Sequence, residues 1–305
     1  MDDYEIIVIG GGPAGLSAAL YLARYDRRVA LFDAGQGRST WHQVNHNYLG
    51  FPGGIPAKQL RERGYEQLAE YDEQVTVLKH KVEQLERDGD RFVASGQAGF
   101  WVARAVILCT GVIDHYPHFD GWDEYVGRSM FWCITCDGYA CKGQKVVVAG
   151  NTDETASMAM QLTRMTSDVT LLTNSDDFEI SRRFVQRLNK ARVPIIRDKI
   201  DRAEGQDGIF EALILKSSDR LPLAQLFSHQ GATPQTELAE QLDVTLAGNG
   251  YILVDSEQKT SQPGVYAAGD VTRLHSHQIT TAVHEGGTAA SSANYFLYPP
   301  ELRDD

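Results

Sequence analysis

The sequence predicts an α/β fold with two Rossmann-like nucleotide-binding domains, because a strand, a glycine turn, a helix and a second strand follow one another twice. The first copy runs from the apolar strand 4–9 to the apolar strand 29–32, and the second runs from 145–149 to 169–172. About 140 residues separate the two turns, which indicates domain duplication rather than a short-period repeat. The length of 305 residues also suits about two domains.

Further elements are expected around these two patterns. Apolar residues recur at helical spacing over 16–25 and 155–165. A long helix is expected over 280–297, where Pro299 and Pro300 end it. The remaining expected strands are 92–94, 101–103, 105–108, 251–254 and 265–268.

Composition excludes several classes of protein. Hydrophobic residues make up 42% and charged residues 23% of the chain, which excludes a disordered or collagen-like protein. The net charge of −12 argues against a surface that wraps nucleic acid or anionic lipid. No apolar run approaches the ~20 residues of a membrane helix, and acidic residues near Met1 argue against an export signal. We therefore expect a cytoplasmic protein.

The first glycine turn carries a dinucleotide-binding pattern. Gly10, Gly12 and Gly15 follow a strand and open a helix, so that backbone could approach a pyrophosphate at the helix N-terminus. Asp33 ends the next strand and is placed to accept a hydrogen bond from a ribose hydroxyl. The alternative is a glycine turn that binds no ligand.

A Cys-x-x-Cys motif lies at Cys133 and Cys136. Two thiols at this spacing can close a small disulfide ring, and a helix that starts there would favour the thiolate. A zinc site and a pair of inert buried thiols remain alternatives, although zinc needs about four ligands and only Cys141 lies nearby. Asp137 could move protons for a thiolate or could only interact with the helix dipole.

A second glycine-acid turn lies near the end of the sequence. Gly269 and Asp270 follow the apolar run 265–268, and a carboxylate at a strand end can hold a cofactor hydroxyl. Many turns contain Gly-Asp, so this signal depends on the first glycine motif.

Taken together, these motifs resemble the low-molecular-weight thioredoxin reductase family of flavoproteins. They occur in family order over nearly the whole chain: GGGPAGL at 10–16, CTG at 109–111, CITCDG at 133–138, GVYAAGDV at 264–271 and QITTA at 278–282. The resemblance implies a three-layer FAD-binding domain over 1–116 and 245–305, with an inserted NAD(P)H-type domain over 117–244 that carries the cysteines. It also implies a homodimer and a thioredoxin-like or other dithiol/disulfide substrate.

The resemblance also implies a role for each candidate site residue. Cys136 would face the flavin, Cys133 would exchange with the substrate disulfide, and Asp137 would transfer protons. Asp270 would hold the ribitol chain, and Gln278 with the following helix start would face the isoalloxazine. The residues implied to bind FAD are Gly10, Gly12, Pro13, Ala14, Gly15, Asp33, Thr110, Gly111, Gly269, Asp270, Gln278, Ile279 and Thr280. No metal site is expected.

The second domain departs from the family pattern. Thr152 replaces a glycine of the central turn, and Thr173-Asn174-Ser175 replaces the family's His-Arg-Arg. Loss of the two guanidiniums removes strong phosphate contacts, and two aspartates follow, which repel a phosphate. These changes argue against NADPH binding in the family's usual mode. The segment 38–53 also differs from the family, near the expected flavin edge.

These departures resemble the pyridine-nucleotide-independent branches of the family. One such branch is the diflavin-linked disulfide oxidoreductases, in which a second FAD occupies the central domain. A ferredoxin-linked or NADPH-dependent thioredoxin reductase, a dithiol oxidase that gives electrons to oxygen, and a non-catalytic flavoprotein redox sensor are alternatives. The electron donor that these branches imply is a ferredoxin-like protein or another donor that the sequence does not name.

Overall fold

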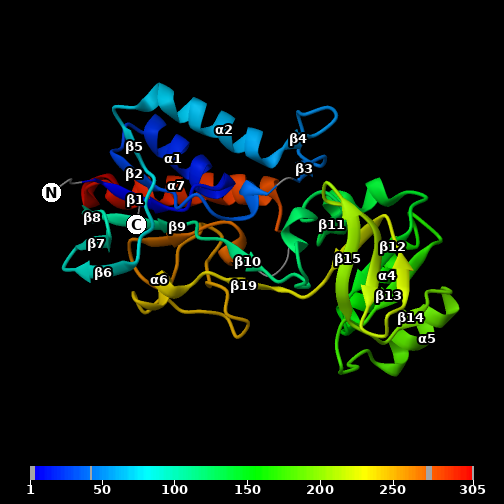
Figure 1. Ribbon diagram of the computed structural model, residues 1–305. Coiled ribbons are helices and arrows are strands. Elements are labelled where there is room, and N and C mark those ends of the chain that lie inside the picture. The colour runs from blue at the N-terminus through cyan, green and yellow to red at the C-terminus, as the bar shows by residue number, and fades with distance from the viewer. Residues whose placement is uncertain (1–3, 42, 273–276, 304–305) are drawn as a thin grey trace. The chain divides into compact units, whose positions relative to one another are not determined.

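The computed structural model describes residues 4–41, 43–272 and 277–303. The chain forms two compact units (Figure 1). Unit 1 comprises Met1–Thr40, Ala57–Ile113 and Thr233–Asp305, and unit 2 comprises Trp41–Pro56 and Asp114–Ala232. Each unit contains a five-stranded parallel sheet between two other layers, so the predicted α/β class with two Rossmann-like domains is confirmed.

The sheet of unit 1 is buried on both faces. Its strand order is β20-β9-β1-β2-β5, and neighbouring strands are parallel. Most of its residues are apolar and buried, as parallel sheets covered on both faces require. The strands are β1 (Ile6–Ile9), β2 (Val29–Phe32), β5 (Val75–Leu78), β9 (Ala105–Leu108) and β20 (Val265–Ala267).

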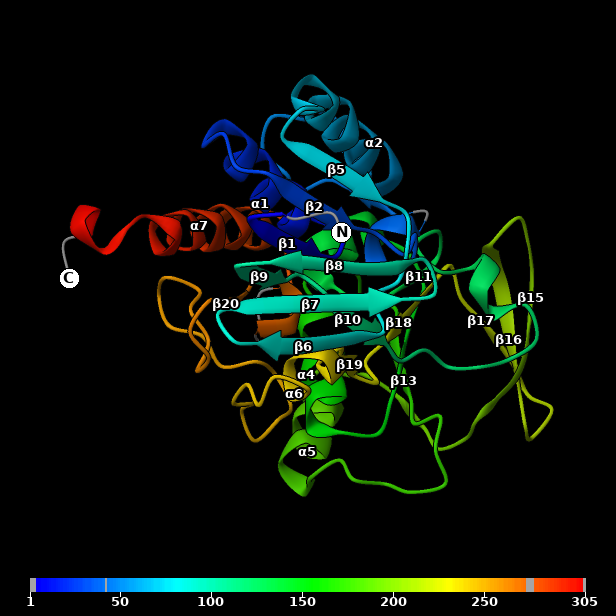
Figure 2. The ribbon, with the colours of Figure 1, turned by 90° about the vertical axis from the view of Figure 1, so that its left-hand side faces the viewer.

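Helices cover one face of this sheet, and a second sheet covers the other. The helices are α1 (Pro13–Arg24), α2 (Ala57–Leu68) and α7 (Ile279–Leu297). The opposite face carries the antiparallel strands β6 (Gln84–Asp88), β7 (Arg91–Gly96) and β8 (Gly99–Ala103), with α6 (Glu237–Glu240) (Figure 2). α1 and α7 pack closely where Gly286 faces Ala14. A Cβ at Gly286 would overlap the carbonyl oxygen of Ala14, so only glycine allows this approach.

Unit 2 repeats this plan. Its parallel sheet has the order β11-β18-β12-β13-β14, formed by Met130–Phe131, Gln225–Ser228, Val146–Ala149, Val169–Leu172 and Ile195–Ile196. One face carries the helices α3 (Ile134–Asp137), α4 (Asp153–Leu162) and α5 (Arg182–Lys190). The other carries the antiparallel strands β15 (Ile200–Gln206), β16 (Ile209–Leu215) and β17 (Arg220–Pro222).

Four short strands complete the fold. β3 (Val44–Asn45) and β4 (Ile55–Pro56) pair within the segment Trp41–Pro56. β10 (Val112–Asp114) and β19 (Ala232–Pro234) pair with each other where the chain passes between the units. No helix in the described ranges has both the length and the apolar character needed to cross a membrane.

The structure corrects one predicted strand and differs from the predicted domain ranges. The strand expected over 251–254 is wrong, because Ile252 makes only an isolated bridge to Leu246. Ile252 is buried in the core of unit 1 and Val254 packs against it, whereas Leu253 is exposed, so this apolar run is not a strand of a sheet. The inserted domain was expected over 117–244, but 233–244 lies in unit 1, where Leu242 and Val244 pack into the core. The segment 41–56 lies in unit 2.

Candidate active site

The first glycine turn joins β1 to α1 at close quarters. Gly10 has a φ of +124°, and a Cβ there would overlap the carbonyl oxygen of Cys109. A Cβ at Gly15 would overlap the carbonyl oxygen of Gly10. Only glycine therefore lets the helix start this near to the sheet.

The start of α1 is open. A Cβ at Gly12 would meet no atom within 4 Å. Gly12 caps the helix with no side-chain hydrogen bond, Pro13 is the first helical residue, and the first turn contains no acidic residue. The free N–H groups of this turn fit a pyrophosphate, because they and the helix dipole attract an anion.

Asp33 lies directly after β2 and is 3% exposed. Its Oδ1 accepts a hydrogen bond from the Gly35 amide at 2.9 Å. Its Oδ2 accepts hydrogen bonds from Tyr65 at 2.5 Å and from Lys79 at 2.9 Å, and forms an ion pair with Arg61. Burial would raise the pKa of Asp33, but the hydrogen bonds from Tyr65 and Lys79 outweigh it, and the pKa falls to about 2. The carboxylate is therefore ionised at every working pH.

Sequence patterns did not identify the donors around Asp33. Arg61 and Tyr65 come from α2, and Lys79 follows β5, so all of them are distant from Asp33 in the sequence. Arg61 Nε also donates to the Gly11 carbonyl at 3.2 Å, which ties α2 to the glycine turn.

The C-terminal glycine-acid turn packs against the same helix start. Gly269 has a φ of +82°, and a Cβ there would lie 3.0 Å from the Cβ of Ala14. The Gly269 amide donates to Oε2 of Glu285 at 2.8 Å, and Glu285 is 1% exposed. Asp270 accepts a hydrogen bond from Arg38 at 2.8 Å. The buried Glu285 thus holds the backbone of this turn through the Gly269 amide, and no sequence motif marks it.

The other predicted cofactor residues also lie in unit 1. Thr110 Oγ1 donates to the Gln235 carbonyl at 2.6 Å, and the Gln235 side chain donates back to the Thr110 carbonyl at 2.5 Å. Gly111 follows with a φ of +68° and open space on its Cβ side. Gln278 is the N-cap of α7, and Ile279 and Thr280 begin that helix.

The two cysteines form a disulfide in unit 2. Cys133 and Cys136 are bonded, with their Cα atoms 5.3 Å apart. Cys133 is the N-cap of α3, and its Sγ accepts a hydrogen bond from the Cys136 amide at 3.1 Å. Asn47 lies beside the pair, with its Nδ2 3.9 Å from Cys136 Sγ. A helix start at this position favours a thiolate on Cys133 after reduction.

Asp137 and Cys141 follow the pair. Burial raises the pKa of the half-buried Asp137 to about 7, so its carboxyl can hold or release a proton near neutral pH. Cys141 is fully buried and donates to Gln225 Oε1 at 2.6 Å. Burial and then the charge of Asp137 raise the pKa of Cys141 to about 12, which leaves it an inert thiol. Within the described ranges, no group of three or more His, Cys, Asp or Glu residues is placed to hold a metal ion.

The corresponding turn of unit 2 is closed. Thr152 replaces the open glycine, and its Oγ1 caps α4 by accepting the Thr155 amide at 3.4 Å. Asp153 and Glu154 occupy the first turn of α4. Hydrogen bonds from its own amide and from Thr152 lower the pKa of Glu154, so it is ionised. A pyrophosphate at this helix start would therefore meet a satisfied cap and two carboxylates.

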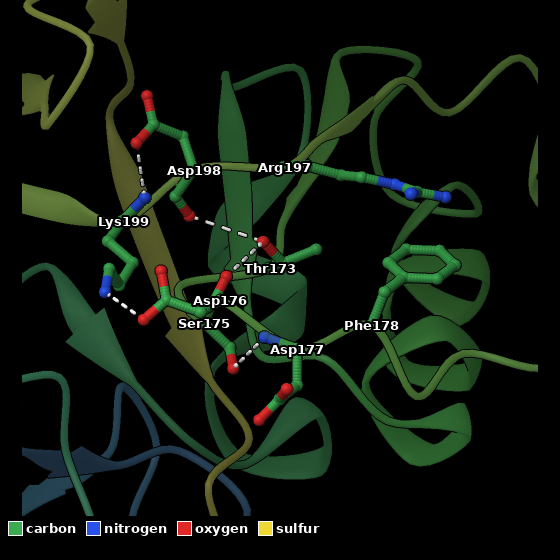
Figure 3. A pocket seen from close by; sticks show the side chains of 8 residues that line it. All are labelled: Thr173, Ser175, Asp176, Asp177, Phe178, Arg197, Asp198 and Lys199. Carbon is green, nitrogen blue, oxygen red and sulfur yellow. Dashed lines mark hydrogen bonds and ion pairs between the residues drawn. The ribbon is translucent and has the colours of Figure 1, made fainter.

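A small polar hollow of about 200 Å³ lies beyond β13 and β14 in unit 2 (Figure 3). The guanidinium of Arg197 lies 3.7 Å from the ring centre of Phe178. Lys199 is paired with Asp176 at 2.5 Å. Asp176 and Asp177, which are expected to repel a 2′-phosphate, thus line this hollow.

Comparisons with known proteins find a family match over most of the chain and several relatives named thioredoxin reductase. Residues 4–286 match the family model described as pyridine nucleotide-disulphide oxidoreductase. The bifunctional thioredoxin reductase/thioredoxin of Mycobacterium leprae is 32% identical over 96% of this chain and 66% of its own length. The thioredoxin reductase of Treponema pallidum is 28% identical over 97% of both chains. The crystal structure of thioredoxin reductase from Streptococcus pyogenes matches with a TM-score of 0.89 at 27% identity, and covers 97% of this chain and 98% of that one.

Proposed function

We propose that this chain, which belongs to the pyridine nucleotide-disulphide oxidoreductase family, exchanges electrons with thioredoxin-like protein disulfides through the Cys133–Cys136 pair. The chain is a flavin-dependent disulfide oxidoreductase similar to low-molecular-weight thioredoxin reductases. The observation that carries the proposal is the bonded pair at the start of α3, followed directly by Asp137. Relatives named thioredoxin reductase, and one fused to a thioredoxin, support a thioredoxin as the partner.

Unit 1 holds FAD in this proposal. The open turn at Gly12 and the N-terminus of α1 would hold the pyrophosphate, and Asp33 Oδ1 would accept a ribose hydroxyl. Asp270 would hold the ribitol chain, and the start of α7 at Gln278 would face the ring system. When bound, FAD supplies or accepts the two electrons that reduce or reform the disulfide.

The cysteines then carry out thiol–disulfide exchange. The Cys133 thiolate, stabilised by the Cys136 amide and the helix start, attacks a sulfur of the partner disulfide. The partner's S–S bond breaks, a mixed disulfide forms, and the departing partner thiolate takes a proton. Cys136 then attacks Cys133 Sγ, which reforms the Cys133–Cys136 bond and releases the second partner thiol. Asp137 supplies and recovers protons, because its pKa of about 7 lets it do both.

The electron donor in this proposal is not NADPH. The closed cap at Thr152 and the carboxylates of Asp153 and Glu154 disfavour any dinucleotide pyrophosphate on α4. The same features disfavour a second FAD in unit 2, so we propose one FAD per chain. If this is right, stoichiometric NADPH will bleach the flavin slowly under anaerobic conditions. Rapid bleaching would contradict the proposal.

The Cys133→Ser variant tests the disulfide role. It should retain yellow FAD but lose exchange between the dithiol form and oxidised thioredoxin, because serine cannot form the mixed disulfide. Cys141→Ala is the matched control, since it removes a thiol from the same unit outside the bonded pair. Undiminished exchange by Cys133→Ser would remove the pair from the mechanism.

A further inference from the structure

We propose that the exposed face of α5 is a docking surface for an acidic protein, namely the partner whose disulfide exchanges with Cys133–Cys136. This inference rests on the proposed function and adds the chemistry of the partner and where it binds.

The charge of α5 is opposite to that of the chain. The whole sequence contains 29 Lys and Arg residues against 41 Asp and Glu residues. Residues 182–192, which form α5 and its end, contain five cations and no acidic residue. The five are Arg182, Arg183, Arg187, Lys190 and Arg192.

The helix separates these cations from its apolar side. Leu188 is buried, and Phe184 and Val185 pack against the same core of unit 2. All five cations are exposed. Positions 183 and 187 lie one helical turn apart, and positions 182 and 190 lie two turns apart, so four of the cations share one side of the helix. The result is a solvent-facing basic patch, which we call the α5 patch.

Helix stability does not explain the α5 patch. Arg187 and Lys190 lie in the last turn, where cations complement the helix dipole. Arg182 and Arg183 occupy the first turn, where the dipole disfavours them. No acidic side chain among the described residues forms an ion pair with any of the five. Such a patch is therefore open to charges on another molecule.

The α5 patch lies in the same layer of unit 2 as the redox disulfide. Ala156 and Leu162 of α4 and Leu188 of α5 belong to one apolar cluster on one face of the sheet, and Ile134 of α3 packs against it. α3 follows edge strand β11, and α5 precedes the opposite edge strand β14. Four strand spacings of ~4.8 Å put these edges about 19 Å apart. A standard protein interface covers about 800 Å² on each partner, so one partner can reach both.

Unpaired guanidiniums and an ammonium select a partner with clustered carboxylates. Complementary charge of this kind speeds encounter and fixes orientation. Arginine also pairs with carboxylates through two parallel hydrogen bonds, which adds geometric selectivity. Nucleic acid is the other polyanion that such a patch could attract, but the net charge of −12 opposes its approach.

The test measures exchange by the holoenzyme after reduction with dithiothreitol and desalting. The probes are an oxidised acidic thioredoxin, a thioredoxin of net positive charge, and uncharged hydroxyethyl disulfide. Each exchange moves two electrons from the Cys133–Cys136 dithiol to the probe disulfide.

The variant carries Arg182→Glu, Arg183→Glu and Arg187→Glu. We expect its second-order rate with acidic thioredoxin to fall about tenfold or more at low salt, with a weaker salt dependence. Its rate with hydroxyethyl disulfide should be unchanged.

A matched control carries Lys58→Glu, Lys81→Glu and Arg104→Glu, three exposed cations of unit 1. It has the same net charge as the α5 variant and should keep the wild-type rate with acidic thioredoxin. Equal slowing of both variants, or of neither, overturns the inference, as does equal preference of the wild type for the two thioredoxins. A milder Arg→Gln version of the α5 variant repeats the measurement if the Glu version loses its exchange with hydroxyethyl disulfide.

Two further outcomes are separable. If the wild type exchanges with no disulfide at all, the proposed function fails, and the docking inference falls with it. If the wild type exchanges normally but the α5 variant loses only its binding to a fluorescent single-stranded RNA, the patch is a nucleic-acid surface and the inference is overturned.

Discussion

The two units share one architecture but differ at the start of the helix that follows the glycine turn in each. Both have a five-stranded parallel sheet, with helices on one face and an antiparallel sheet on the other. In unit 1, α1 starts beside Gly12 with open space and no acidic residue in its first turn. In unit 2, α4 starts beside Thr152, whose side chain caps the helix, and Asp153 and Glu154 follow. The fold is repeated, but the open helix start without acidic residues is not.

This difference teaches that ligand binding depends on a few atoms rather than on the fold. One side-chain cap satisfies an amide that a phosphate would otherwise bind, and two carboxylates reverse the local charge. Unit 2 carries the disulfide helix α3, whose Ile134 packs against the apolar cluster of that unit.

The largest expected effect comes from giving unit 1 the charge of unit 2. Gly12→Asp places a carboxylate where the pyrophosphate would lie. Like-charge contact of this kind costs several kcal/mol, so FAD affinity should fall about 1000-fold. Flavin fluorescence during titration of the flavin-free protein measures it. The control is Gly89→Asp, at an open hairpin position with a φ of +61° that aspartate tolerates. If Gly12→Asp purified with its full complement of FAD, the comparison would be broken.

Asp137 is expected to give the next largest effect. Its pKa is raised to about 7 by burial, so the protonated fraction falls as pH rises through 7. Exchange steps that need its proton should slow over this range. Asp137→Asn should reduce the exchange rate about 100-fold and should remove the inflection near pH 7. Stopped-flow rates with hydroxyethyl disulfide across this range measure both, and an unchanged inflection would assign it to another group.

Much of the fold was predictable because its signals are local. The strands over 29–32, 105–108 and 169–172 match their predicted bounds, since each is a short apolar run between turns. α7 begins at Ile279, one residue before its predicted start. The glycine turn and the disulfide motif are also contiguous in sequence. The strand expected over 251–254 failed because burial without pairing has the same apolar pattern.

The unpredicted part of the site depends on contacts between distant segments. Asp33 was identified, but Arg61, Tyr65 and Lys79 were not, because nothing in the sequence near them indicates a carboxylate partner. Glu285 lies in the middle of the long helix α7, and nothing in the nearby sequence indicates its partner. The fold places its carboxylate beside the Gly269 amide. The contact of Asn47 with Cys136 likewise depends on the segment 41–56 joining unit 2.

A smaller effect is expected from opening the turn of unit 2. The combined change Thr152→Gly, Asp153→Ala and Glu154→Ala removes the cap and both carboxylates. Affinity for ADP should rise about tenfold, because each first-turn charge contributes up to about 1 kcal/mol. Calorimetric titration measures it. Removal of the exposed carboxylates Glu66 and Glu70 from unit 1 is the control and should have no such effect. No gain in the triple variant would show that other residues close the site.

The smallest expected effect is on the free energy of unfolding, and it compares one lysine–aspartate pair in each unit. Lys79 is largely exposed but donates to buried Asp33, whereas Lys199 pairs with exposed Asp176. Lys79→Gln should lower the free energy of unfolding by about 0.5–1 kcal/mol, and Lys199→Gln should leave it unchanged.

The pH dependence has a definite sign. The pKa of Asp33 is lowered from 3.8 to about 2, so its stabilising contribution is complete above pH 3.8 and is lost as pH falls through about 2. The difference between Lys79→Gln and the wild type in urea unfolding should therefore shrink below pH 4. A constant difference down to pH 2 would mean that the pairing with Asp33 is not its cause.

The central claim is that only unit 1 holds a dinucleotide. The most direct test is to denature the purified wild-type protein and count the FAD released per chain by absorbance and mass. The account predicts one FAD per chain. Two FAD per chain, or none after incubation with excess FAD, would contradict it.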